Sequence, residues 1–173
     1  MNHKTQISME CDCDPDTALT RLMKSERDDM LRYACFRLGN MPDAEDTVQD
    51  VYIRLRASPH HLPTKQLRNY LYRSLSNLCT DRLRRNSRQC FVSLEQASHI
   101  VSTDINARTF EQEFHRINLL LNGLPDEQAE VIRLRLHGNK SFSEISEIQN
   151  IPLTTAKSRF QYGIEKLRKV LQN

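Results

Sequence analysis

Six polar side chains lie close together between positions 154 and 162, and their types suit contacts with nucleic acid better than catalysis. They supply hydroxyls, an amide, a phenol and a cation, without a carboxylate. Such groups pair with base edges in the major groove of DNA, and the hydroxyls and the cation can also bind phosphates. The set comprises Thr154, Thr155, Lys157, Ser158, Gln161 and Tyr162.

The element that carries these groups is predicted to be the second of two helices between Ser141 and Leu171. Ser141 and Glu144 have the spacing of a capping box, which starts the first helix. Pro152 ends that helix and suits the first turn of the next, because proline has no amide proton. Apolar residues then recur every three or four positions as far as Leu171. The pattern predicts a helix-turn-helix, with a plain helical hairpin that has a solvated polar side as the alternative.

Charge is unevenly distributed along the chain, although the formal net charge is only +3. Residues 65–88 hold seven cations and one acid, whereas residues 43–50 hold four acids and no cation. Such segregation favours one surface that binds a polyanion and another that binds a basic partner. Pairing of the two stretches with each other is the alternative.

The basic stretch is predicted to form a long helix from Thr64 to Arg85, with tyrosines among its cations. Cations that follow phosphates, together with rings that stack on unpaired bases, suit a single nucleic-acid strand. Burial in the core is the alternative for both rings. We favour burial for Tyr72 and leave the two readings open for Tyr70.

The acidic stretch is predicted to begin another helix near Asp43. The dipole of a helix favours carboxylates in its first turn, which accounts for part of these acids. It does not account for Gln49 and Asp50, which lie beyond the first turn. Their position favours a surface for a basic partner.

The fold is predicted to be all-α, because the chain has only four glycines, abundant leucine and arginine, and few alternating β-branched runs. We expect two small helical domains joined by a flexible linker, the second being a four-helix domain that contains the helix-turn-helix. The expected boundaries are a disordered tail at 1–18, a first domain at 19–88, a linker at 89–112 and a second domain at 113–173.

The chain has five cysteines, an odd number, and no apolar signal segment for export. Together these two features indicate reduced thiols in a reducing compartment. No apolar run approaches the roughly 20 residues that span a bilayer. We therefore expect a cytoplasmic protein without membrane insertion. Cys11 and Cys13 have only His3 as a further nearby metal ligand, so a frayed tail is favoured there. A structural role is favoured over redox control for Cys79 and Cys90.

Catalysis is not predicted. The sequence has no Gly-rich phosphate loop, no metal-ligand cluster and no nucleophile–base pair at motif spacing. His99, His115 and His137 are scattered, which favours surface or half-buried positions. We expect no catalytic residue, no bound metal and no cofactor.

Three segments together resemble a known family, the extracytoplasmic-function (ECF) group of bacterial sigma factors. Residues 43–55, DAEDTVQDVYIRL, resemble the polymerase-binding segment of that group. Residues 70–85, YLYRSLSNLCTDRLRR, look like its promoter-melting segment. Residues 124–131 and 141–171 are similar to its C-terminal DNA-reading domain. The matches occur in the family's order, and the ECF group also lacks the middle domain of larger sigma factors.

The resemblance implies a role for each segment. The first domain would be sigma region 2 and the second would be sigma region 4. The clamp helices of the polymerase beta-prime subunit would be bound by Asp46, Gln49, Asp50 and Arg54. The minus-ten element and its melted non-template strand would be bound by Lys65, Arg68, Tyr70, Arg73, Asn77, Arg82, Arg84, Arg85 and Arg88. The duplex minus-thirty-five element would be read by Thr154, Thr155, Lys157, Ser158, Arg159, Gln161 and Tyr162.

The function implied is that of an ECF sigma factor, which binds core RNA polymerase and directs promoter recognition, DNA melting and transcription initiation. An anti-sigma factor is the expected regulatory partner, and we expect the free protein to be held compact or by a partner. A stand-alone helix-turn-helix regulator is the alternative. It would leave residues 43–88 without a role and would need a dimer seam that the sequence does not show.

The chain departs from the family pattern at three positions. Tyr70 stands where the family often has tryptophan, which puts the strength of that contact in question. Tyr162 and Gly163 stand where many members have Arg-Ala. This change removes a phosphate contact and places glycine inside a helix, at a cost of about 1 kcal/mol relative to alanine.

Overall fold

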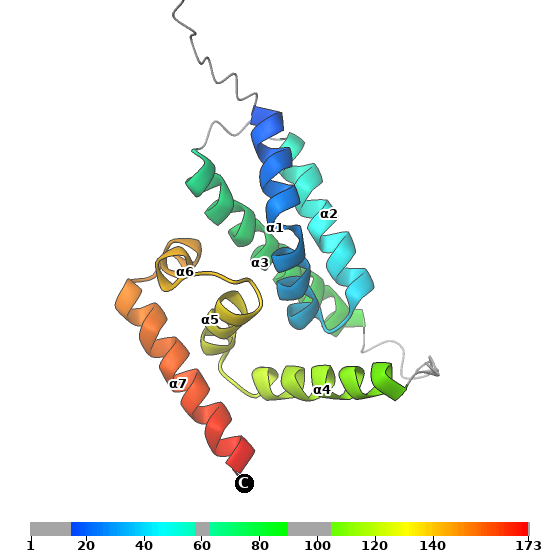
Figure 1. The fold of residues 1–173 in the computed structure, drawn as a ribbon, viewed down its shortest axis with the longest axis vertical. Coiled ribbons are helices and arrows are strands. Elements are labelled where there is room, and N and C mark those ends of the chain that lie inside the picture. The colour runs from blue at the N-terminus through cyan, green and yellow to red at the C-terminus, as the bar shows by residue number, and fades with distance from the viewer. Residues whose placement is uncertain (1–14, 58–62, 90–104, 173) are drawn as a thin grey trace, which may run out of the picture.

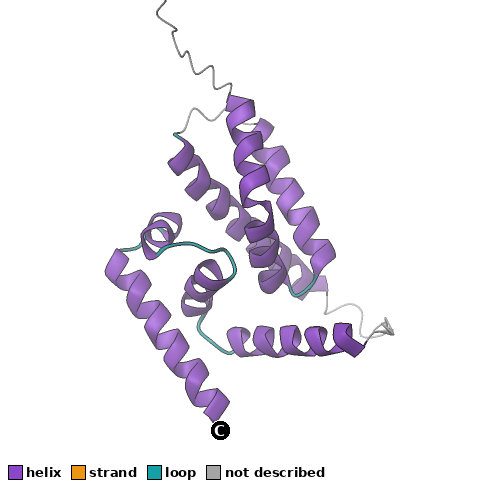
Figure 2. Ribbon diagram, viewed as in Figure 1, coloured by secondary structure: helices purple, strands orange, loops and turns teal. Residues whose placement is uncertain are grey.

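The computed structural model describes residues 15–57, 63–89 and 105–172, and within these ranges every regular element is a helix (Figures 1 and 2). The all-α prediction is therefore confirmed. The helices are α1 (Pro15–Leu38), α2 (Met41–Ala57), α3 (Thr64–Gln89), α4 (Ile105–Asn122), α5 (Asp126–Leu136), α6 (Phe142–Gln149) and α7 (Leu153–Gln172).

The first three helices form an N-terminal unit, in which α1 and α2 lie side by side and α3 packs against both (Figure 1). The turn between α1 and α2 is tight, because Gly39 takes a φ of +84° that favours glycine. The side chain of Asn40 then accepts the backbone N–H of Asp43 at 2.8 Å, which caps the start of α2.

Helices α4 to α7 form a C-terminal unit, with α7 along its outer edge (Figure 1). A small core joins Leu121, Leu124, Ala129 and Ile132 to half-buried residues of α7. Helices α5 and α7 approach closely at Gly163, where an added Cβ would lie 2.7 Å from Cδ1 of Ile132. The glycine that the sequence marks as a local weakness is thus the position at which these two helices meet.

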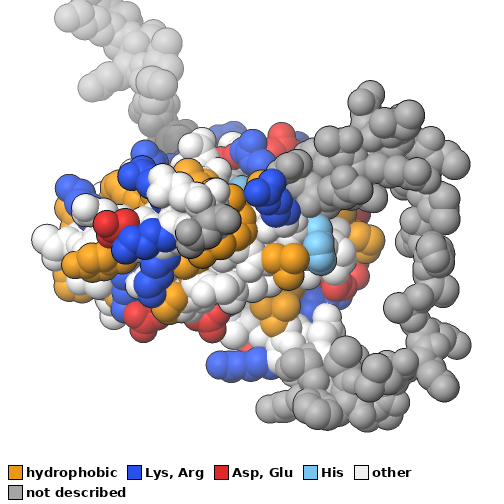
Figure 3. All heavy atoms as spheres, turned by 90° about the horizontal axis from the view of Figure 1, so that it is seen from below, with side chains coloured by type: hydrophobic (Ala, Val, Ile, Leu, Met, Phe, Trp, Pro, Cys, Tyr) orange, Lys and Arg blue, Asp and Glu red, His pale blue; other side chains and the backbone are white. Residues whose placement is uncertain are grey.

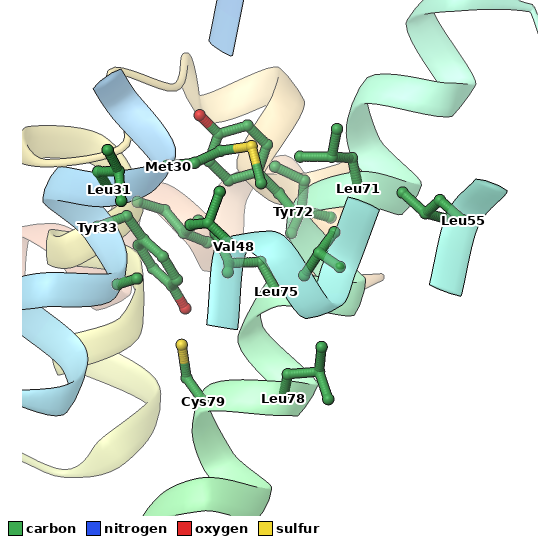
Figure 4. Close-up of a cluster of buried hydrophobic side chains, with 14 of the residues drawn as sticks. Met30, Leu31, Tyr33, Val48, Leu55, Leu71, Tyr72, Leu75, Leu78 and Cys79 are labelled. Atoms are coloured by element: carbon green, nitrogen blue, oxygen red, sulfur yellow. The ribbon is translucent and has the colours of Figure 1, made fainter. Parts of the chain in front are cut away.

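The two units share one continuous core. Buried residues of α1 and α3, among them Met30, Leu71 and Tyr72, lie in the same cluster as Val131 of α5 and Ile148 of α6. Figure 4 shows the part of this cluster that α1, α2 and α3 contribute. Burial of Tyr72, which the sequence favoured, is confirmed, since its side chain is fully enclosed.

Several helix limits differ from the sequence prediction. Helix α1 begins at Pro15 rather than Leu19, α3 runs to Gln89 rather than Arg85, and α4 begins at Ile105 rather than Glu113. The last difference arises because the apolar repeat weakens before Glu113 although the helix has already begun. Part of the segment predicted as linker is therefore helical, while residues 1–14 and 90–104 lie outside the described residues.

Three leucine and valine residues of the helical apolar repeats are exposed, although their spacing in the sequence would predict burial. Leu136, Val170 and Leu171 are more than half exposed, at 56%, 60% and 56%. Across the helices described here, no segment is both long enough and apolar enough to cross a membrane.

Candidate nucleic-acid and partner interfaces

The exposed side of α2 carries the residues predicted to bind polymerase. Asp46, Gln49, Asp50 and Arg54 are all exposed and recur at helical spacing, so they share one face. Ile53 lies on the same face with 55% of its surface exposed. An exposed apolar side chain beside acids suits a partner surface on which basic side chains surround an apolar patch.

Arg82 connects α3 to the first turns of α2. Its guanidinium donates to the buried hydroxyl of Thr47 at 2.8 Å and to the backbone carbonyl of Asp43 at 3.1 Å. It also pairs with the carboxylates of Asp43 and Asp46 at 3.4 and 3.2 Å. The sequence placed Arg82 among the DNA contacts, whereas here the side chain holds an acid of the α2 face in position.

Three other cations of α3 lie against α6, the first helix of the helix-turn-helix. Lys65 pairs with Glu147 at 3.0 Å. Arg73 donates to the backbone carbonyls of Glu147 and Ile148 at 2.6 and 3.0 Å, at the C-terminal end of α6 where carbonyls lack helical partners. Arg68 approaches Glu144 at 3.9 Å.

The remaining residues of the predicted minus-ten set are distributed along α3. Arg84 and Arg85 are exposed near its C-terminal end, and Tyr70 is 37% exposed. Asn77 is exposed and lines a cleft of about 530 Å³ between the two units, together with Arg73 and Arg159. The side chain of Arg88 lies outside the described part of the chain.

The helix-turn-helix has the local geometry that the sequence predicts. The Ser141 hydroxyl accepts the backbone N–H of Glu144, and the Glu144 carboxylate accepts the N–H of Ser141, which makes the capping box reciprocal. Helix α6 ends at Gln149, and the residue that caps it, Asn150, takes a left-handed φ of 53°. Ala156 is fully buried, and the rings of Phe142 and Phe160 meet edge to face at 5.3 Å.

The side of α7 predicted to read DNA is only partly exposed. Thr154, Lys157, Gln161 and Tyr162 are exposed, and these residues lie on the first turns of the helix. Thr155, Ser158 and Arg159 are half-buried, and the guanidinium of Arg159 pairs with Glu127 of α5 at 2.5 Å. The four exposed residues are therefore the members of the predicted set that a partner could contact directly.

Two buried carboxylates hold the units together. Glu26 of α1 pairs with Lys140 at 2.5 Å, accepts from the Tyr72 hydroxyl at 3.1 Å and pairs with Arg68 at 2.8 Å. The ammonium group of Lys140 also lies 4.2 Å from the centre of the Tyr72 ring. Because Lys140 belongs to the C-terminal unit, this cluster crosses between the units.

Glu130 of α5 forms the second cluster. It accepts hydrogen bonds from the hydroxyls of Tyr33 and Ser76, the latter at 2.8 Å, and pairs with Arg37 at 3.5 Å. All three partners belong to the N-terminal unit. Burial, followed by the charge of Glu130, raises the pKa of Tyr33 well above its ordinary value, so its hydroxyl remains a donor.

Sequence reasoning missed both clusters. A signal was present in α1, where Glu26 stands four positions from Leu22 and from Met30, on the stripe that is otherwise apolar. An acid at such a position is buried and needs a partner. The identity of that partner could not be read, because Lys140 lies in another unit, 114 residues along the chain.

The contact between α1 and the end of α5 contains a histidine with a lowered pKa. The ring of His137 stacks on Phe36 with 3.6 Å between centres. Burial, followed by the charges of Arg133 and Arg32, lowers the pKa of His137 to about 4. The ring is therefore neutral at physiological pH.

The described thiols are poorly reactive. Burial raises the pKa of Cys79 to about 12 and also raises that of Cys35. Cys90, Cys11 and Cys13 lie outside the described residues.

An apolar groove of about 410 Å³ lies between α4 and α7. Leu119 and Val170, at 59% and 60% exposure, line it together with Lys166 and Lys169. Figure 3 views the molecule from the end at which α4 and the C-terminus of α7 lie, and it shows hydrophobic side chains exposed beside basic ones.

Comparison with known proteins assigns this arrangement to a family. Residues 22–89 match the family model of Sigma-70 region 2, and residues 120–169 match that of Sigma-70 region 4. The chain is 32% identical over 158 residues to the ECF RNA polymerase sigma factor SigW of Bacillus subtilis (strain 168), with 84% of each chain covered. The chain belongs to the ECF sigma factors.

Another relative of this sigma factor is SigE of Mycolicibacterium smegmatis, also an ECF RNA polymerase sigma factor. The two are 30% identical over 158 residues, which cover 87% of this chain and 60% of SigE.

Solved structures share the fold. CnrH in complex with the cytosolic domain of CnrY superimposes with a TM-score of 0.64 at 20% identity, covering 89% of this chain and 87% of CnrH. The sigma factor RpoE from Bartonella quintana, in complex with the anti-sigma factor NepR, gives a TM-score of 0.54 at 22% identity. That match covers 90% of this chain and 92% of RpoE.

Proposed function

We propose that this sigma factor binds core RNA polymerase through α2 and directs it to promoters that α3 and α7 recognise. The observation that carries the proposal is the match to SigW along most of both chains, with regions 2 and 4 in order. The exposed acids Asp46 and Asp50 support α2 as the polymerase-binding surface, because a basic partner would find them accessible.

The DNA contacts divide between two elements. The minus-ten element and its melted strand are assigned to α3, where Arg84 and Arg85 are exposed together with Asn77. The duplex minus-thirty-five element is assigned to the exposed side of α7 around Lys157 and Gln161. The polymerase supplies the chemistry, so this chain acts in the cytoplasm as an initiation factor rather than an enzyme.

An anti-sigma factor is the proposed regulatory partner. Support comes from RpoE of Bartonella quintana, a fold neighbour whose solved structure contains the anti-sigma factor NepR. An anti-sigma factor would have to cover α2, α3 or α7 to prevent initiation.

The experiment that tests the function is reconstitution with bacterial core RNA polymerase. We expect the full-length protein to co-elute with core polymerase in size exclusion and the mixture to transcribe from a subset of a promoter library. The double variant Asp46→Arg/Asp50→Arg should lose co-elution, because reversal of two charges repels a basic partner.

The matched control is Asp28→Arg, which changes an exposed acid of α1 outside the α2 face. Unchanged co-elution of the double variant would remove α2 from the polymerase interface. Specific duplex binding by the protein alone, without co-elution, would instead favour a stand-alone regulator.

A further inference from the structure

Helix α7 begins with an exposed leucine. Leu153 is the first residue of the helix and is 42% exposed, and its neighbours Pro152 and Thr154 are exposed as well. Lys157 and Gln161 follow it at intervals of four positions, and both are exposed. Side chains four positions apart lie one above another on a helix, so Leu153, Lys157 and Gln161 form one row along the surface of α7. Leu153 thus extends the surface assigned to the minus-thirty-five element to the first residue of the helix.

The turn before α7 fixes the position of Leu153. The Ser146 hydroxyl donates to the carbonyl of Ile151 at 2.7 Å, and the carbonyl of Ser146 accepts the backbone N–H of Ile151 at 3.0 Å. The backbone N–H of Ala156 donates to the carbonyl of Pro152 at 3.0 Å, which closes the first turn of α7. The backbone that carries Leu153 is therefore held to α6 before any ligand binds, so little conformational entropy is lost when the side chain makes a contact.

The row combines three kinds of side chain. In the major groove an amide pairs with adenine, and a cation pairs with guanine or with a phosphate. Leucine has no hydrogen-bonding group, and the apolar feature of that groove is the C5-methyl group of thymine. In a helix-turn-helix, the residues at the start of the recognition helix are those that reach base edges. No acid stands in the first turn of α7 to repel a phosphate.

We propose that Leu153 recognises one thymine of the minus-thirty-five element by packing against its C5-methyl group. The inference rests on the proposed function for the identity of the duplex, and it adds an apolar base-reading residue to the polar set predicted from the sequence. A contact of this kind discriminates against cytosine and uracil, because neither base carries the methyl group. Leu153 therefore determines specificity at one position of the element.

The test removes the methyl group from the DNA and leaves the protein unchanged. The wild-type protein is assembled with core RNA polymerase and bound to a fluorescently labelled promoter duplex taken from the transcribed subset of the library. Each thymine of the minus-thirty-five element, on either strand, is replaced singly by deoxyuridine. We expect one replacement to weaken binding about threefold to fivefold, which is the effect of one methyl group leaving an apolar contact, and the others to leave it nearly unchanged.

A protein variant then links that thymine to Leu153. Leu153→Ala should weaken binding of the unmodified promoter about threefold to tenfold, because it removes most of the apolar contact. The deoxyuridine replacement should have almost no effect on this variant, since the methyl group has already lost its partner. The matched control is Leu171→Ala, which shortens a 56% exposed leucine at the other end of α7 and should keep the full dependence on the methyl group.

Two outcomes overturn the proposal. In one, no thymine of the element shows the methyl effect with the wild-type protein. In the other, the effect persists in Leu153→Ala, so that another residue meets the methyl group. Failure of the proposed function is distinguishable from both, because it would appear as a polymerase complex that does not prefer the unmodified promoter over a scrambled duplex. The two outcomes above leave that preference intact.

Discussion

At the scale of single residues, Gly163 stands where helix propensity and packing conflict. Alanine is favoured over glycine by about 1 kcal/mol in a helix interior. Here, however, its Cβ would meet Ile132, which is 1% exposed and has little room to move. We expect Gly163→Ala to lower the free energy of unfolding by about 1–2 kcal/mol in urea denaturation.

A double variant identifies the cause. Ile132→Val removes the Cδ1 atom that the new Cβ would contact. The loss of unfolding free energy caused by Ile132→Val should therefore be smaller in the Gly163→Ala background than in the wild type. We expect a coupling energy of about 1 kcal/mol between the two changes. A more stable Gly163→Ala single variant would mean that the helices separate without strain.

Protonation of His137 should make the stability of the folded protein depend on pH. Its pKa is about 4 in the folded protein, below the ordinary value of 6.5. The unfolded chain therefore binds this proton first as the pH falls, so stability declines between about pH 6.5 and pH 4. With allowance for the partly exposed ring, we expect this group to contribute a loss of about 1–2 kcal/mol.

The measurement is urea denaturation of the wild type and His137→Gln at pH 7, 5.5 and 4. Carboxylates titrate in both proteins, so the difference between them isolates the histidine. The stability gap between the two should narrow as the pH falls, and a constant gap would show that the ring is not kept neutral by folding.

At the scale of elements, the orientation of Asp46 on the exposed face of α2 depends on Arg82 of α3. We expect Arg82→Met to weaken co-elution with core polymerase, because Asp46 loses the guanidinium that orients it. Unfolding should become easier by about 1 kcal/mol through loss of the bond to buried Thr47.

Arg85→Met is the matched control, since Arg85 is exposed on the same helix and would act on DNA only. It should reduce binding of the protein to a labelled single-stranded oligothymidylate and leave co-elution with core polymerase unchanged. If the two arginine variants behaved alike, Arg82 would belong with the DNA contacts that the sequence assigned to it.

A further prediction concerns Lys157 of helix α7. Lys157 is exposed on the side assigned to the minus-thirty-five element, so Lys157→Ala should weaken binding of the polymerase complex to promoter DNA. The slope of log affinity against log salt should also fall by about 1, because one phosphate contact is lost. Lys169→Ala, at the other end of α7, should change the slope less.

At the scale of the whole molecule, the shared core predicts cooperative unfolding. Val131, Leu134 and Ile148 of one unit are buried with Leu71 and Tyr72 of the other, so each unit loses part of its buried core when they separate. We expect a single calorimetric transition in the wild type. Lys140→Met should divide it into two, because the contact between the units is weakened first.

Much of the fold was readable because helices are local. The capping box at Ser141, the turn at Pro152 and the periodic apolar residues each depend on neighbours within a few positions, and all three were predicted. The helix limits at Pro15, Gln89 and Ile105 were missed, since the backbone of a helix can continue beyond the apolar repeat from which its limits are predicted.

The sequence by itself determined the helices, the segregation of charge and the family, because these follow from residue types at short spacing and from motif order. It could not determine what the charges meet. Three of these contacts join parts of the chain that are distant in sequence. They are the ion pair of Arg82 with Asp46, the hydrogen bond of Arg73 to α6 and the ion pair of Glu26 with Lys140. The tertiary structure settles them, because a carboxylate removed from water is stabilised only by partners brought to it in space.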